Sequence, residues 1–234
     1  MHPRPSRLAV VLLFVTLSAA SAACLGLSGL RVRATGSMEY IFMPWNLALA
    51  WVPMGFAACA VWAYRARLPF AAWLAPMTLW LLFLPNAPYL VTDVIHLRNS
   101  WASAPIWFDS LMFSAFGITG LLLGYASLYL VHTMMAERYG KRTARAATVI
   151  AIMLSSAGIY LGRALRLNSW DAILHPELLP SMVMHRVAHP LSNPQMLTFV
   201  AMMSILLAGG YALFVVSARA AAEYVEHPES RARR

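Results

Sequence analysis

Two polar clusters follow apolar stretches of this sequence and contain side chains suited to acid–base chemistry or anion binding. The first contains Asn86, Asp93 and His96, beginning within the motif Pro-Asn-Ala-Pro-Tyr at 85–89. Residues three apart share one face of a helix, so we expect the Asp93 carboxylate and the His96 imidazole to lie together. Such a pair orients a catalytic histidine or shares a metal ion. The alternative is a structural hydrogen-bonded pair at the end of a helix. We predict Asp93 and His96 as catalytic residues.

The second cluster contains two arginines, Arg163 and Arg166, followed by Asn168 and Asp171. The arginines are also three apart, so their guanidinium groups can converge on a phosphate or carboxylate. The alternatives are arginine side chains that extend from a helix end towards water and a helix cap formed by Asn168 and Asp171. We predict that an anionic substrate binds here, and the predicted substrate-binding residues are Arg163, Arg166, Asn86, Asp109 and Asp171.

A third pattern aligns Ser181, His185 and His189 at intervals of four residues, on one side of a short helix that ends before Pro190. Two histidines at this spacing can bind a metal, but zinc sites need three or four ligands. A helix lying on a membrane surface also needs a polar side in any case. We therefore predict no metal ligand, and the cofactor stays unknown. Glycine-rich phosphate loops, nucleophile elbows, His-Glu-x-x-His and paired-cysteine motifs do not occur in the sequence.

The composition indicates the environment in which these clusters lie. Of 234 residues, 60% are hydrophobic and 12% are charged, whereas soluble domains have about 45–50% apolar and about 25% charged residues. The chain is therefore expected to be an integral membrane protein with the lipid bilayer as its partner. The net charge of +9 does not indicate nucleic acid, because the basic residues form short clusters between apolar stretches rather than one basic face.

Six apolar stretches, at roughly 8–30, 41–63, 69–91, 106–131, 145–162 and 194–218, approach the length that a membrane-crossing helix needs. Lipid offers no hydrogen-bond partners to an open backbone, so each stretch must be helical. We predict an all-α bundle of six transmembrane helices in a single domain, 1–234, with a basic tail at 219–234. The first stretch also resembles a cleavable export signal, but its apolar character continues to Leu30 and favours an uncleaved helix.

The distribution of charge predicts the orientation of the bundle. With both termini in the cytoplasm, 12 of the 18 Lys and Arg residues lie on the cytoplasmic side, as the positive-inside rule requires. All three Asp and four of the seven His residues then lie on the other side. A functional site is therefore expected at the outer interface of the membrane.

Proline and glycine predict a local break and a packing surface. We expect the third helix to break within 84–88, where Pro85 and Pro88 interrupt the apolar stretch. Broken helices at membrane depth are covered by protein or face an aqueous cavity. Gly117, Gly120 and Gly124 form a stripe of small residues, which favours close packing of a neighbouring helix.

The segment 81–97 (Leu-Leu-Phe-Leu-Pro-Asn-Ala-Pro-Tyr-Leu-Val-Thr-Asp-Val-Ile-His-Leu) resembles a family of uncharacterised bacterial multi-pass membrane proteins. The family is classed as a domain of unknown function. The segment 160–171 fits the same family, and the similarity covers about 45–215. The resemblance implies a polytopic helical protein in the bacterial cytoplasmic (inner) membrane, but it implies no activity.

Three functions agree with these patterns. The first is an enzyme that uses an outer-interface polar site to act on a lipid or lipid-linked anionic substrate. The second is a transporter or permease for a small anionic solute, suggested by the proline-interrupted third helix and by a weak internal repeat. In this repeat, Tyr-Leu is followed by Asn-Ser-Trp after both the third and the fifth stretch. The third is a non-catalytic membrane assembly partner. The sequence does not decide between enzyme and non-enzyme.

Overall fold

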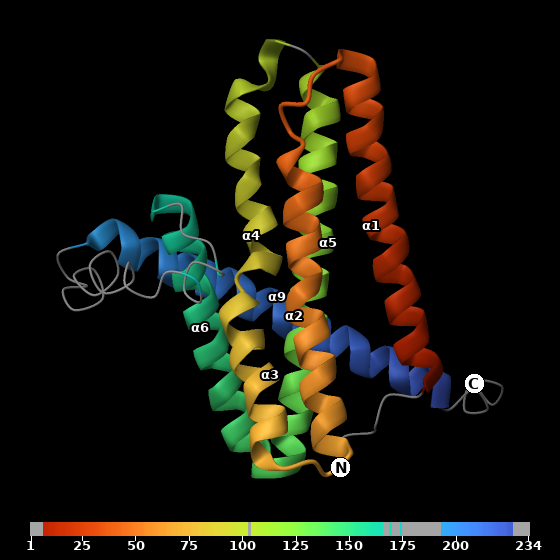
Figure 1. Ribbon diagram of the computed structural model, residues 1–234, viewed down its shortest axis with the longest axis vertical. Helices are drawn as coiled ribbons and strands as arrows, with labels where there is room; N and C mark the ends of the chain where they lie inside the picture. Colours follow the sequence, from red (N-terminus) through yellow and green to blue (C-terminus); the bar gives the residue numbers. More distant parts are fainter. Residues whose placement is uncertain (1–6, 103, 166–168, 170–173, 175–192, 227–234) are drawn as a thin grey trace, which may run out of the picture.

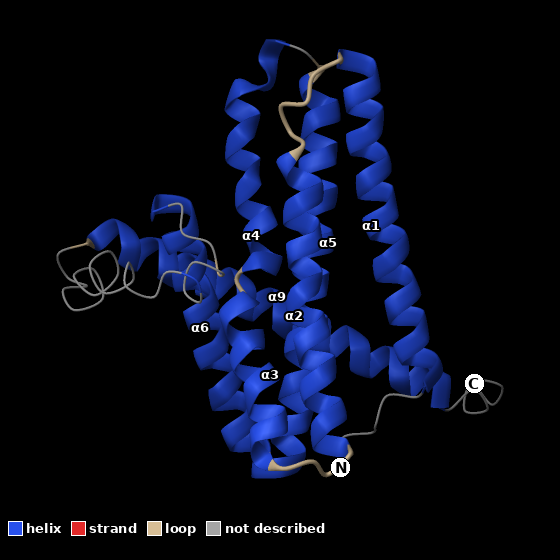
Figure 2. Cartoon of the chain, viewed as in Figure 1, coloured by secondary structure: helices blue, strands red, loops and turns tan. Residues whose placement is uncertain are grey.

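The computed structural model describes residues 7–102, 104–165, 169, 174 and 193–226. These residues form helices joined by short turns, without any strand (Figure 2). The helices are α1 (Arg7–Thr35), α2 (Phe42–Arg65), α3 (Phe70–Phe83), α4 (Asn86–Thr92), the 3₁₀-helix η1 (Asp93–Ala102), α5 (Ile106–Tyr139), α6 (Lys141–Leu165) and α9 (Pro194–Glu226).

Six helical segments of the described chain are long and apolar enough to cross a membrane, and α3, α4 and η1 together make one of them, Phe70–Arg98. The predicted all-α, six-helix class is confirmed, and the protein is a multi-pass membrane protein. Long helices α1, α2 and α5 run side by side, with α3, α4 and α6 beside them (Figure 1). Helix α9 crosses the others obliquely and packs against α5 and α6.

The helices begin and end where the sequence requires it. Pro69 and Pro105 adopt extended ψ angles, 153° and 132°, immediately before α3 and α5. Gly140 has a φ of +86°, a left-handed conformation that costs glycine little. It joins α5 to α6 in a turn of one residue, which places the two helices antiparallel.

The predicted break in the third apolar stretch is confirmed at Leu84 and Pro85, which separate α3 from α4. Pro53 and Pro76 instead lie inside continuous helices. After the break, α4 packs against the predicted glycine stripe of α5. A Cβ at Gly120 would collide with the Ala87 carbonyl oxygen, and one at Gly124 would lie 3.3 Å from the Ala87 Cβ. The small residues therefore allow α4 to approach α5 closely.

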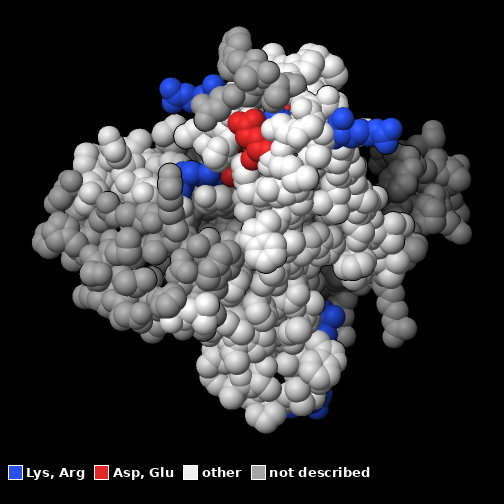
Figure 3. Space-filling model, turned by 45° about the horizontal axis from the view of Figure 1, so that its top comes forward, with Lys and Arg blue, Asp and Glu red and all other residues white. Residues whose placement is uncertain are grey.

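Charged residues of the described chain lie towards the two ends of the bundle, and the two ends differ in composition. The polar end, where α1 and α6 finish and α2 and α5 begin, has Arg31, Glu39, Asp93, Asp109 and Arg163. In Figure 3, the acidic residues gather towards this end. The opposite, basic end has Arg65, Arg67, Arg138, Lys141, Arg142 and Arg145. Both described Asp residues thus lie at the same end, whereas Asp171 lies outside the described residues.

Candidate functional site

The change from α4 to a 3₁₀-helix aligns the first polar cluster. A 3₁₀-helix has three residues per turn, so side chains three apart eclipse each other. Asp93 and His96 are the first and fourth residues of η1 and therefore share a face more closely than they would on the α-helix expected from the sequence. Both side chains meet Arg163, which α6 supplies from its last turn.

Arg163 is the centre of this cluster. Its Nη2 donates to Asp93 Oδ1 at 2.6 Å and to Thr92 Oγ1 at 2.6 Å, and its Nε also donates to Thr92 Oγ1, at 3.2 Å. The guanidinium carbon lies 4.1 Å from the centroid of the Tyr89 ring, a cation–π distance. These contacts hold the guanidinium plane in one orientation. Because 22% of the side chain is still exposed, a ligand can reach it.

Asp93 is fully buried and bonded on both carboxylate oxygens. Oδ1 accepts from Arg163, while Oδ2 accepts from Asn46 Nδ2 at 3.1 Å. A buried carboxylate needs such compensation, because burying an unpaired charge is costly. Asp93 therefore serves as the counter-ion that positions Arg163 and ties α2, η1 and α6 together. Within the described residues, Arg163 bridges the predicted Asp93–His96 pair, because it contacts both side chains.

His96 presents a half-buried imidazole to the cavity. Its Nε2 lies 3.4 Å from Arg163 Nη1. A guanidinium only donates, so Nε2 accepts in this contact. The ring packs at 4.9 Å against Phe42, and the backbone carbonyl accepts a hydrogen bond from Tyr40 Oη at 3.3 Å. The imidazole is thus held between Arg163 and Phe42, while Tyr40 fixes its backbone.

These side chains surround a cavity of about 480 Å³ between α2, α4, η1 and α6. That volume is in the range of small-molecule sites. The lining mixes polar and apolar groups: Phe42, Asn46, Leu49, Asn86, Tyr89, Asp93, Ile95, His96, Gly162 and Arg163. Four of the predicted site residues, Asn86, Asp93, His96 and Arg163, therefore meet in one place. With Asn46, they offer a cation, an imidazole and two amides to a bound molecule.

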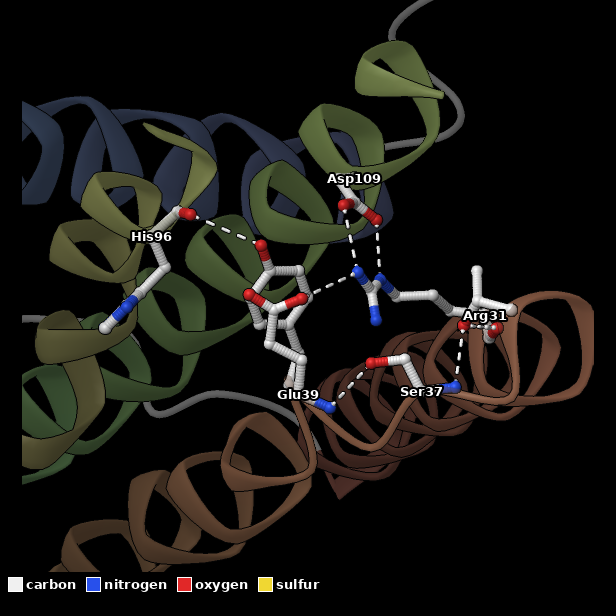
Figure 4. Close-up of polar contacts among 7 residues, drawn as sticks. Arg31, Ser37, Glu39, His96 and Asp109 are labelled. Carbon is white, nitrogen blue, oxygen red and sulfur yellow. Dashed lines mark hydrogen bonds and ion pairs between the residues drawn. The ribbon is translucent and has the colours of Figure 1, made fainter. Parts of the chain in front are cut away.

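Asp109 belongs to a second cluster rather than to the cavity. It accepts two hydrogen bonds from Arg31, from Nε at 2.8 Å and from Nη2 at 3.3 Å (Figure 4). Arg31 also faces Glu39 at 3.5 Å and lies over the Tyr40 ring at 4.1 Å. Asp109, predicted as a substrate-binding residue, is thus not among the residues that line the cavity. The two clusters are connected through Tyr40, whose hydroxyl reaches the His96 carbonyl.

Some predicted residues lie outside the described part of the chain, and the sequence analysis did not name some of the residues that the structure brings into the two clusters. Arg166, Asp171, His185 and His189 lie outside the described residues. Among the residues that are described, no three His, Cys, Asp or Glu side chains could hold a metal ion. Sequence reasoning missed Asn46, Tyr89 and Thr92 in the first cluster and Arg31 in the second. An amide inside an apolar stretch, such as Asn46, is itself a signal of a functional or structural polar site, and so is a guanidinium directly after one, such as Arg31.

Comparison with known proteins supports the resemblance seen in the sequence. Neither a curated protein nor a solved structure matches the chain. The family model described as "Protein of unknown function (DUF1361)" matches residues 45–209. The matched region runs from α2 into α9 and contains the cavity, except for Phe42. This chain belongs to the DUF1361 family of proteins of unknown function.

Proposed function

We propose that the cavity binds the anionic head group of a lipid or lipid-linked substrate and that His96 acts there as a general acid or base. The observation that carries this proposal is the fixed, partly exposed guanidinium of Arg163 beside the half-buried His96 in a 480 Å³ cavity. Asp93 is the positioning residue, because its carboxylate is buried and occupied.

The roles follow from the donors that remain available. Arg163 uses Nε and Nη2 for Thr92 and Asp93, whereas among the described residues Nη1 has only the long 3.4 Å contact to His96. A phosphate or carboxylate oxygen that replaces this contact would gain a charge-assisted hydrogen bond. It would also release His96 Nε2 for proton transfer to or from the substrate.

The apolar part of the lining supports an amphiphilic substrate. Phe42, Leu49 and Ile95 border the same cavity as the polar groups. The cavity lies towards the polar end of helices that can cross a membrane, a level at which lipid head groups meet acyl chains. The proposed location is the cytoplasmic membrane of a bacterium, with the polar end outside and the basic end in the cytoplasm. Cysteines that replace Arg33 and Arg142 should react with a thiol reagent from opposite sides of the membrane. Labelling of the cysteine at position 142 from outside intact cells would refute this orientation.

The proposed activity is tested with purified protein in detergent micelles. Membrane phospholipids are added, and head-group turnover is followed by phosphorus NMR while bound lipid is counted by native mass spectrometry. We expect His96→Gln to abolish turnover but retain binding, and Arg163→Gln to lose binding. Arg33→Gln removes the same charge from an exposed arginine at the polar end and should change neither. Retained binding and turnover in Arg163→Gln would contradict the proposal.

Transport is the second candidate, and the broken third helix favours it. The break at Leu84 and Pro85 lies inside the span Phe70–Arg98, and Asn86 directly after it lines the cavity. Discontinuous helices facing a cavity are typical of transporter binding sites. Transport requires a sealed compartment, so flux of an anionic solute into proteoliposomes without turnover in detergent would favour this candidate over the enzyme.

A further inference from the structure

The orientation of the Asn46 side chain is determined by its partner. Its terminal atom lies 3.1 Å from Asp93 Oδ2, and a carboxylate oxygen paired with an arginine can only accept. The atom must therefore be Nδ2, which leaves the acceptor Oδ1 on the other branch of the amide. No donor within the described residues reaches this oxygen, although Asn46 lines the cavity.

Asn86 is oriented in the same way from the opposite wall. Its Nδ2 donates to the Phe83 carbonyl and to Ser169 Oγ, both at 3.1 Å. The Phe83 carbonyl can only accept, so this assignment is also fixed by chemistry. Both N–H groups of Asn86 are used, while in the described part of the chain its Oδ1 receives no donor. Two amide oxygens, from α2 and α4, are thus available to a molecule in the cavity.

A phosphate group cannot satisfy these oxygens. A phosphodiester has acceptor oxygens alone, which match the Arg163 guanidinium but not another acceptor. An ammonium group would donate too, but burying its charge against two neutral amide oxygens costs more than burying a hydroxyl, because both oxygens of Asp93 are already bonded. A hydroxyl donates without adding charge, and an amide oxygen left unpaired in a ligand-filled site is costly.

We infer that the head group carries hydroxyls beyond its phosphate, as in a phosphodiester of glycerol or of a sugar. This inference rests on the proposed function, because it assigns the remaining polar groups of the same cavity. Arg163 contacts the phosphate, while Asn46 Oδ1 and Asn86 Oδ1 accept hydrogen bonds from the hydroxyls. The amides then determine which anionic lipid is bound.

The test compares lipids of equal charge. The protein is placed in nanodiscs of phosphatidylcholine, and the affinity is measured by native mass spectrometry for phosphatidylglycerol and for phosphatidylethanol, which is a phosphodiester without hydroxyls. Two hydrogen bonds of ordinary net strength predict binding of phosphatidylglycerol about tenfold tighter. Monoglucosyl diacylglycerol and a synthetic glucosyl phosphate lipid distinguish a glycerol head group from a sugar. Phosphatidylethanolamine tests the ammonium alternative.

Asparagine variants show which side chains produce the preference for phosphatidylglycerol over phosphatidylethanol. Asn46→Leu and Asn86→Leu should each reduce the preference for phosphatidylglycerol over phosphatidylethanol to about threefold. Asn193→Leu makes the same substitution outside the cavity and should keep the full preference. If Asn46→Leu does not fold because it also loses the bond to Asp93, Asn86→Leu alone decides.

The outcomes show whether this inference fails alone or together with the proposed function. Equal affinity for phosphatidylglycerol and phosphatidylethanol, with both lost in Arg163→Gln, would overturn the inference and leave the anion site intact. Preference for phosphatidylethanolamine would overturn it in favour of an ammonium. Monoglucosyl diacylglycerol has no phosphate. If it binds as tightly as phosphatidylglycerol and its binding does not depend on Arg163, the phosphate contact is wrong in both the proposed function and this inference. No anionic lipid binding above the phosphatidylcholine background would overturn both.

Discussion

Two arginine–aspartate pairs lie at the polar end of the bundle, and they differ in what surrounds them. In the Arg31–Asp109 pair, 2% and 0% of the side chains are exposed, and neither residue lines the cavity. In the Arg163–Asp93 pair the aspartate is equally buried, but 22% of the arginine is exposed and both residues line the cavity. The same chemical pair thus joins α1 to α5 in one place and forms the wall of a ligand site in the other.

The comparison teaches that residue type does not by itself distinguish a structural ion pair from a site. Both pairs place charge within helices that can cross a membrane, where charge is costly and needs a partner. What differs is the surroundings of the remaining guanidinium N–H groups. Arg31 is enclosed by Asp109, Glu39 and Tyr40, whereas Arg163 presents Nη1 to His96 beside the cavity.

The largest effect is expected for Asp109→Ala. This change removes the two hydrogen bonds to Asp109 and leaves the buried Arg31 guanidinium with the carboxylate of Glu39 at 3.5 Å. We expect a loss of about 3 kcal/mol in the free energy of unfolding, because breaking a buried pair leaves an uncompensated charge. Unfolding by SDS titration in detergent measures it. The double variant Arg31→Met with Asp109→Leu should recover most of the loss, and failure to recover would show that the pair does more than balance charge.

Asp93→Asn should cost less stability, about 1–3 kcal/mol, because the partly exposed Arg163 can be hydrated from the cavity. The same SDS titration measures the loss. Lipid binding should decrease in this variant and stay unchanged in a folded Arg31→Met, Asp109→Leu double variant. If Asp93→Asn destabilises as much as Asp109→Ala while binding is preserved, the two pairs are equivalent and the proposed distinction is wrong.

Gly120→Ala tests whether the position of α4 matters separately for the two clusters. Its Cβ would collide with the Ala87 carbonyl, and relieving such overpacking costs about 1–3 kcal/mol. We expect thermal melting to show this loss and lipid affinity to fall, because α4 leads directly into η1. Gly55→Ala is the control, since nothing lies within 4 Å of its added Cβ. Unchanged melting of Gly120→Ala would contradict the close packing of α4 on α5.

Local rules in the sequence predict much of the fold. Apolar length predicts the six spans, Pro85 predicts the break between α3 and α4, and the glycine stripe predicts close packing of a neighbouring helix, which the structure identifies as α4. They also predict that Asp93 and His96 share a face, because that depends on four consecutive residues. The meeting of these two with Arg163, 70 residues from Asp93, is anticipated only from their common end of the bundle.

The remaining contacts depend on how the helices pack, which no local rule contains. Arg31 and Asp109 are 78 residues apart, and Asn46 reaches Asp93 across 47 residues. Asp109 is expected in the site because it lies at the polar end of the bundle. On α5, however, its side chain faces α1 and contacts Arg31. Distance along the chain therefore separates what the spacing of residues can predict from what only the assembled bundle determines.

The smallest effect is expected for Tyr40→Phe, which tests whether the two clusters influence each other. The change removes the 3.3 Å hydrogen bond to the His96 carbonyl but keeps the ring under Arg31 and against Phe113. We expect a loss of about 0.5–1 kcal/mol in stability and a fall in lipid affinity of less than about fivefold. Tyr64→Phe, near the basic end, makes the same change far from both clusters and should alter neither. If Tyr40→Phe lowers stability without changing lipid affinity, the Arg31–Asp109 cluster supports the bundle alone and His96 is positioned by Arg163 and Phe42.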